Sequence, residues 1–233
     1  MKKTSIIWIF SLLLIGTYLI IPTSCGKDDD ENVPSDTNTV KDIDGNVYHT
    51  VTIGTQVWMT ENLKTSKFRD GTSIPNLKDD LAWRKAYSPA YCWFDNNTSN
   101  KNTYGALYNW YAIETGELAP LGWHIPTDAE WEALLTYLGE YVAGGKMKEV
   151  GLKNWSSPNT GATNESGFSG LPGGSRNYKG SFANFGNNGY WWSSTEPIFS
   201  DPWYLYLEYN SSYAILDRFS SMGMGFSVRC VRD

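Results

Sequence analysis

Hydrophobic and polar positions alternate with a period of two near the start of the folded region, which predicts a β-hairpin. β-Branched and polar residues alternate from Val47 to Ile53, Gly54 and Thr55 interrupt the pattern, and residues 56–59 resume it. A glycine between two alternating runs is typical of the turn in an antiparallel pair.

The middle of the chain has the helical period of about 3.6 residues. The clearest helix begins at Thr127, whose hydroxyl can form a capping box with Glu130, and an apolar stripe then runs to Gly139, which is placed to end the helix. A short amphipathic helix is expected at residues 104–113, and a shorter helical piece at 145–150.

After residue 154 the helical period disappears. Residues 154–174 are rich in Gly, Ser, Asn and Thr and predict a long ordered loop, and residues 66–90 also predict mostly loop. Alternating or continuous apolar runs predict strands at 190–194, 203–209, 214–218 and 225–231. Strands, then helices, then strands predict an α+β domain with an antiparallel sheet and long irregular loops.

The first 24 residues have the composition of an export signal. A cationic start at residues 1–3 precedes an apolar stretch at 6–21, and Cys25 follows at the position where a cleaved chain would begin. This layout is typical of a bacterial lipoprotein, in which cleavage before Cys25 and acylation of its thiol tether the protein to a membrane. The alternative interpretation is an N-terminal transmembrane anchor.

The remaining chain divides into a tether and a domain. Residues 25–39 have almost no apolar side chain after the cysteine, so we expect a flexible acidic tether, followed by one domain at 40–233. The acidic run at 27–31 resembles the export signal that directs Bacteroidota lipoproteins to the outer face of the outer membrane. The alternative is a solvated spacer.

Charge and composition limit the classes of partner. The whole chain has a net charge of −6, and without residues 1–24, which hold Lys2 and Lys3 and no acidic residue, the net charge is −8. Such a chain repels polyanions, so we expect no nucleic-acid partner. Aromatic residues make up 15% of the chain, with 11 Trp and 15 Tyr. Rings of this kind fill a loop-rich core or stack on sugars.

Two cysteines remain when Cys25 is lipidated. An even remainder in an exported protein predicts a disulfide between Cys92 and Cys230, with two buried free thiols as the alternative.

Few sequence motifs indicate a catalytic or metal site. The two histidines, His49 and His124, are not accompanied by a His/Cys cluster with zinc spacing, so no metal or other cofactor is expected. A glycosidase needs two carboxylates about 5–10 Å apart, and Glu196, Asp201 and Glu208 are candidates for such a set.

Aromatic rings and amides near the C-terminus are the richest candidate binding set. Sugar rings stack on aromatic faces, and amides bond their hydroxyls. The candidate ligand-binding residues are Trp191, Trp192, Trp203, Tyr213, Asn187, Asn188 and Asn210. Adjacent residues of a strand point to opposite faces, so at least one of Trp191 and Trp192 belongs to the core.

Several segments together resemble the Fibrobacter succinogenes major paralogous domain. The segments that carry the resemblance lie at residues 44–48, 53–63, 108–112, 122–131, 171–174, 190–196 and 226–232. The family implies secreted or surface-anchored proteins, many of them lipoproteins, with no assigned activity.

A more distant likeness concerns residues 124–131 and 225–230, which are similar to the formylglycine-generating sulfatase-modifying enzymes. It implies a C-type-lectin-like fold, with two helices flanking small antiparallel sheets. Those enzymes use a cysteine pair in a late loop, and residues 160–224 contain no cysteine, so we do not expect their oxidase activity.

The sequence therefore predicts a non-catalytic, lipid-anchored protein on the cell exterior that binds a glycan or a protein. The alternative is a polysaccharide-acting enzyme that uses a carboxylate pair.

Overall fold

A computed structural model describes residues 38–197, 199–218 and 221–233, and these belong to one compact unit. The expected signal peptide, Cys25 and all but the end of the expected tether lie outside the described residues. The first strand starts at Thr39, one residue before the expected domain boundary. Within the described ranges, no helix has the length and apolar character needed to cross a bilayer.

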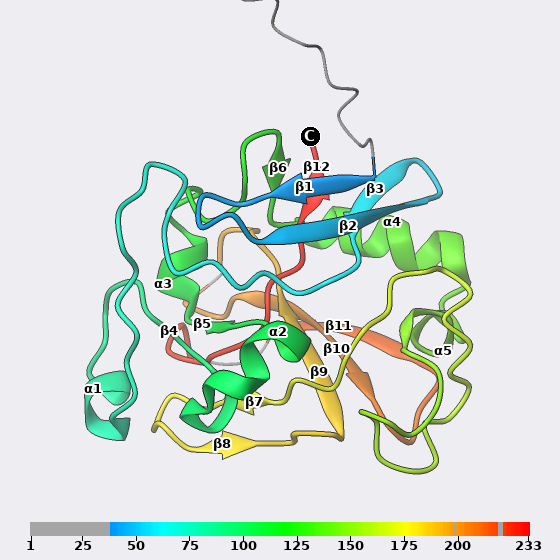
Figure 1. The fold of residues 1–233 in the computed structure, drawn as a ribbon. Helices are drawn as coiled ribbons and strands as arrows, with labels where there is room; N and C mark the ends of the chain where they lie inside the picture. Colours follow the sequence, from blue (N-terminus) through cyan, green and yellow to red (C-terminus); the bar gives the residue numbers. More distant parts are fainter. Residues whose placement is uncertain (1–37, 198, 219–220) are drawn as a thin grey trace, which may run out of the picture. The chain divides into compact units, whose positions relative to one another are not determined.

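Strands and short helices alternate along the unit (Figure 1). The strands are β1 (Thr39–Lys41), β2 (Val47–Ile53), β3 (Gln56–Met59), β4 (Tyr91–Cys92), β5 (Leu107–Tyr108), β6 (Trp123–His124), β7 (Ser175–Arg176), β8 (Phe182–Ala183), β9 (Asn188–Trp192), β10 (Trp203–Glu208), β11 (Ala214–Arg218) and β12 (Val231–Arg232). The helices are α1 (Asp80–Arg84), α2 (Lys101–Tyr104), α3 (Trp110–Ile113), α4 (Asp128–Leu138) and α5 (Ala143–Met147), with 3-10 turns at Phe94–Asn96 and Thr98–Asn100.

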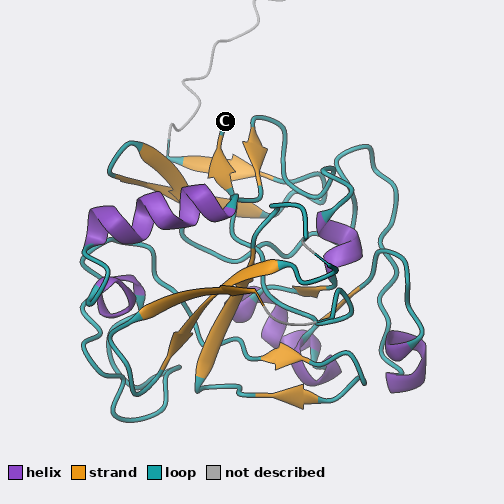
Figure 2. Ribbon diagram, turned by 180° about the vertical axis from the view of Figure 1, so that it is seen from behind, coloured by secondary structure: helices purple, strands orange, loops and turns teal. Residues whose placement is uncertain are grey.

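The strands form two main antiparallel sheets. One has the order β1-β2-β3-β12-β6, and the other has the order β11-β10-β9. The pairs β4-β5 and β7-β8 form small separate ribbons. The rear view shows α4 lying along the side of the molecule next to both main sheets (Figure 2). The architecture is therefore α+β, as the order of the sequence patterns predicts.

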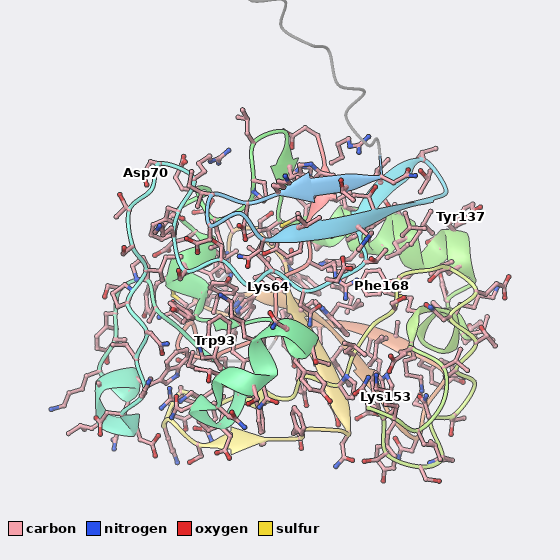
Figure 3. All side chains as sticks on the ribbon, in the orientation of Figure 1. Lys64, Asp70, Trp93, Tyr137, Lys153 and Phe168 are labelled. Atoms are coloured by element: carbon pink, nitrogen blue, oxygen red, sulfur yellow. The ribbon has the colours of Figure 1, made fainter. Side chains whose placement is uncertain are left out.

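Strand β9 separates the two larger apolar clusters of the described core. Trp191 packs with Trp58, Trp131 and Phe168 under α4, whereas Trp192 packs on the other face with the cluster around Phe226. The Trp58 and Trp131 ring centres are 4.7 Å apart, and Phe168, labelled in Figure 3, meets both rings edge-on. Large aromatic side chains fill these clusters because each buries much apolar area in few residues.

The predicted hairpin and the predicted capped helix are confirmed. Residues of β2 pair with β3 from Thr50–Met59 to Ile53–Gln56. Helix α4 begins after Thr127 with both hydrogen bonds of the capping box, and Gly139 follows its last turn. The strand predicted at 214–218 also matches β11, and β9 and β10 lie within two residues of the predictions.

The helix predicted at 104–113 is wrong. The segment contains the end of α2, strand β5 and then α3. Gly105 ends α2 with a φ of 74° and lies so close to Asn62 that a Cβ would be 2.7 Å from the Asn62 Cβ. Asn109 then starts α3 by accepting a hydrogen bond from the Ala112 amide. Tertiary contacts therefore override the helical spacing. The short helix predicted at 145–150 is found slightly earlier, as α5 at Ala143–Met147.

The strand predicted at 225–231 is mostly wrong, because its residues pair one at a time with different partners. Gly225 bridges Arg176, Phe226 bridges Tyr108, and Ser227 bridges Trp191 before β12 begins at Val231. The segment runs from the small ribbons to the five-stranded sheet, so it never forms one continuous ladder. The loop predicted at 66–90 also contains α1, and the loop at 154–174 is anchored by the buried rings of Trp155 and Phe168.

The predicted disulfide is absent, because Cys92 and Cys230 are both free and buried. Cys92 belongs to β4 and packs with Trp83 and Leu107, whereas Cys230 lies in a different cluster, beside β12. The Cys230 carbonyl accepts a hydrogen bond from the Met59 amide in the five-stranded sheet. Each thiol thus fills its own apolar cluster, which was the alternative interpretation of the sequence.

Candidate ligand-binding surface

Trp191 and Trp192 do not form a ligand surface. Both have 0% exposure, and both indole N–H groups are used inside the protein. The Trp191 Nε1 donates to Asn62 Oδ1 at 2.8 Å, and the Trp192 Nε1 donates to the Tyr108 carbonyl at 2.7 Å. The expectation that either ring binds a ligand is corrected, because both faces of β9 are covered by core clusters.

The other predicted residues fall at opposite ends of β10. Trp203 begins this strand and is half-buried beneath Arg218, whose Cζ is 5.5 Å from the ring centre. Asn188 pairs with Glu208 at the other end, where its side chain donates to Glu208 Oε1 at 3.4 Å. The five residue steps of a strand separate these ends by about 17 Å. Trp203 and the amides therefore do not surround one ligand, and Asn187, beside Asn188, lies with the amides.

Tyr213 and Asn210 do lie on an exposed surface, in the turn between β10 and β11. Tyr213 is 50% exposed, and its ring meets Tyr141, which is 74% exposed, at a centre distance of 6.1 Å and an angle of 73°. The Ser212 hydroxyl donates to the Tyr141 carbonyl at 3.2 Å, so the turn is held against the segment after α4. This arrangement places two exposed tyrosine rings edge to face.

A hollow of about 350 Å³ lies between α4 and β11, and it is lined by chain neighbours of the two tyrosines rather than by the tyrosines themselves. Glu140 precedes Tyr141, Ala214 follows Tyr213, and both line this hollow between α4 and β11; the complete lining is Glu132, Leu135, Thr136, Glu140 and Ala214. Leu135 and Ala214 provide an apolar base, whereas the carboxylates and the Thr136 hydroxyl can accept hydrogen bonds. We call the hollow together with Tyr141 and Tyr213 the tyrosine groove.

Sequence reasoning found Tyr213 and Asn210 but missed Tyr141, Glu132 and Glu140. The exposed positions of α4 were available from its apolar stripe, since Glu132 and Thr136 lie on the opposite side from Leu134 and Leu138. The missing information was tertiary, because only the fold brings the turn after β10 to the end of α4.

The candidate carboxylates also separate. Glu196 and Asp201 lie in the segment between β9 and β10, whereas Glu208 lies at the far end of β10. The length of this strand, about 17 Å, exceeds the spacing that glycosidases use. Glu208 therefore does not form a catalytic pair with either of the other two.

His124 is the centre of a titratable group at the start of α4. Its Nε2 lies 2.8 Å from Glu130 Oε1, and its Nδ1 lies 2.7 Å from Asp233 Oδ1. Burial lowers the pKa of His124, but the hydrogen bonds to Asp233 and Glu130 outweigh it and raise the pKa above its ordinary value. Glu130 is also the capping-box residue, so this group fastens the helix start to the C-terminal strand.

Across the part of the chain that the structure describes, no three His, Cys, Asp or Glu side chains form a cluster that could hold a metal ion. On the tyrosine groove, the groups available to a ligand are aromatic rings, carboxylates and hydroxyls.

Comparison with known proteins places the chain in one family. The model of the Fibrobacter succinogenes major domain matches residues 51–232. No curated protein and no solved structure gives a significant match. Because the matched range covers most of the chain, this protein belongs to the Fibrobacter succinogenes major domain family.

Proposed function

We propose that this protein is a non-catalytic glycan-binding protein and that the tyrosine groove is its binding site. The observation that carries the proposal is the exposed ring pair of Tyr141 and Tyr213 beside a hollow lined by Glu132 and Glu140. Apolar faces of sugars stack on such rings, and carboxylates accept hydrogen bonds from sugar hydroxyls.

The test compares ring removal in the groove with ring removal elsewhere. We expect the purified full-length protein to bind members of a neutral glycan array and the Tyr141→Ala/Tyr213→Ala variant to lose at least tenfold in affinity. The matched control is Tyr87→Ala/Tyr111→Ala, which removes a second surface tyrosine pair with a ring-centre distance of 6.3 Å. Equal loss in both variants, or binding only to a protein partner, would contradict the proposal.

The alternative is an enzyme that acts on polysaccharide. Glu132 lies on α4 and Glu140 follows the end of this helix, and both are exposed. Exposed carboxylates in an open hollow lack the enclosed, water-excluding surroundings in which catalytic groups act. This favours binding over turnover. Release of sugar by the purified protein, abolished by Glu132→Gln, would reverse the assignment.

We also propose that Cys25 carries the lipid anchor and that the domain faces the cell exterior. The cationic start, the apolar stretch and the acidic run after Cys25 support this location. Protease added to intact cells is then expected to remove the domain, and protection of the domain in intact but not in opened cells would place it in the periplasm.

For the fold, we propose the C-type-lectin-like arrangement, which the antiparallel sheets, the long loops and the pairing of the C-terminal strand β12 with β3 support. An experimental structure that superposes on no lectin-like domain would reject this assignment.

A further inference from the structure

The turn between β10 and β11, at residues 209–213, carries Tyr213 of the tyrosine groove and lies against α5 (Figure 1). The Ser212 carbonyl accepts a hydrogen bond from the Gly145 amide at 2.9 Å. The Tyr213 carbonyl lies so close to Gly144 that a Cβ there would be 2.1 Å from its oxygen. The turn therefore faces the helix with its backbone, which leaves the half-exposed Tyr213 ring at the surface.

Lys148, the residue that follows α5, binds the same turn with its side chain. The residue is fully buried, and its ammonium group is surrounded by backbone carbonyls. Its Nζ donates to the carbonyls of Thr160 and Glu208, each at 2.9 Å, and to that of Ser211 at 2.7 Å. An ammonium group has three N–H donors, so one side chain fastens a loop, the end of β10 and the turn together.

The charge of Lys148 is buried without a carboxylate partner. None of the ion pairs among the described residues includes it, and the face of Trp155, with its ring centre 5.3 Å from Nζ, lies beside the carbonyls instead. Burying such a charge costs more free energy than burying an apolar side chain of similar length. Stability alone therefore does not account for a lysine here, whereas holding three carbonyls in one arrangement does.

Tyr213 depends on the position of this turn through short hydrogen bonds. Its amide donates to the Ser211 hydroxyl at 3.1 Å, and the Ser212 hydroxyl donates to the Tyr141 carbonyl at 3.2 Å. Ser211 is thus bonded to Lys148 through its carbonyl and to Tyr213 through its hydroxyl. A shift of the turn would change how the two exposed tyrosine rings meet.

We propose that Lys148 is a positioning residue of the tyrosine groove, whose ammonium fixes the turn so that the Tyr213 ring meets Tyr141 edge to face. Lys148 lies beneath the surface and acts only through Tyr213. The role of this arrangement in binding rests on the proposed function of the groove, but the contact between the two rings can be measured without any glycan.

The first test replaces the lysine by an apolar side chain of similar length. In the full-length protein, we expect Lys148→Met to lose most of the nuclear Overhauser contacts between the Tyr141 and Tyr213 rings and to bind glycan roughly tenfold more weakly. The matched control is Lys146→Met in α5, because Lys146 Nζ pairs with Glu165 at 3.5 Å and does not bind the turn. This control should leave both measurements unchanged.

A combined variant shows whether the lysine acts through the tyrosine. Adding Lys148→Met to Tyr213→Ala should lower glycan affinity no further, because the ring that the lysine positions is already removed. A lysine that only stabilises the fold would lower the affinity again in the combined variant.

Rescue by a small amine tests the charge and its N–H donors. Lys148→Ala removes the atoms from Cγ to Nζ, which together have the structure of n-propylammonium. We expect refolding of this variant with n-propylammonium to restore the contacts between the tyrosine rings, and n-propanol, which has the same chain and no charge, to leave them lost. This measurement also decides the question if Lys148→Met does not fold.

Several results would overturn the proposal. These are unchanged ring contacts in folded Lys148→Met, an equal effect of Lys146→Met, equal rescue by the amine and the alcohol, and failure of n-propylammonium to restore the contacts. If the wild type binds no glycan but Lys148→Met still loses the ring contacts, the proposed function fails and the positioning of Tyr213 by Lys148 stands.

Discussion

At the scale of single residues, buried cations hold the long loops of this protein. Arg229, Arg176 and Lys148 are fully buried, and each donates to several backbone carbonyls, most of them in distant segments; the acceptors are Met59, Phe168, Leu77, Lys78, Gly180, Thr160, Glu208 and Ser211. Burial lowers the pKa of Lys148 to about 8, so it is still mostly protonated at neutral pH. A cation with several donors satisfies loop carbonyls that no strand or helix partner would satisfy.

His124 makes the stability of the folded protein depend on pH. Because its folded pKa is raised above the ordinary value of 6.5, its charge stabilises the protein fully below that pH, and this contribution is lost as pH rises through the folded pKa. We expect the melting temperature of the wild type to exceed that of His124→Gln by more at pH 5.5 than at pH 8.5. Glutamine stays neutral throughout and serves as the control. A difference that is constant with pH would contradict this prediction.

At the scale of elements, α5 is fitted to its surroundings by glycine. An added Cβ at Gly144 would lie 2.1 Å from the Tyr213 carbonyl oxygen, and one at Gly145 would lie 2.3 Å from the Gly161 carbonyl oxygen. The helix can approach the turn before β11 only because these positions have no side chain. The same contact sets the backbone of Tyr213 in the tyrosine groove.

Gly144→Ala is therefore expected to destabilise the protein, although alanine favours a helix by about 1 kcal/mol over glycine. The clash with the Tyr213 carbonyl should outweigh that gain and leave a net loss of about 2 kcal/mol in the free energy of unfolding, measured by urea denaturation. Thr103→Ala on the exposed side of α2 is the control and should change stability by less than about 0.5 kcal/mol. Equal stability of Gly144→Ala and the wild type would show that the turn can move away.

The elements that could be predicted are those whose signals are local. The hairpin has its own turn, and α4 has its own cap and apolar stripe, so residues within each element determine it. Residues 104–113 and 225–231 also have regular patterns, but contacts with Asn62 and with three different segments decide their structure. The candidate site followed the same rule. Tyr213 was identifiable from the sequence as an aromatic candidate, whereas its neighbour Tyr141 depends on how distant segments meet.

At the scale of the whole molecule, packing in the core clusters and the hydrogen bonds of the buried cations hold distant segments together without the disulfide that the cysteine count predicted. Burial raises the pKa of the Cys92 thiol to about 12 and raises that of Cys230 further, so neither forms a reactive thiolate at neutral pH. Arg229 and Cys230 are neighbours in one segment that joins the small ribbons to the five-stranded sheet. Noncovalent packing of this segment therefore connects the end of the domain to its middle.

The accessibility of the thiols tests whether Cys92 and Cys230 are free and buried. We expect iodoacetamide at pH 7.5 to leave Cys92 and Cys230 largely unmodified in the native protein and to alkylate both in 6 M guanidinium without reductant, as measured by peptide mass spectrometry. Reductant should not change the melting temperature, because there is no bridge to break. If the two cysteines stay unmodified in denaturant until reductant is added, and the melting temperature then falls, the bridge exists in the exported protein. Arg229 and its carbonyl partners would then hold a segment that is already covalently tied.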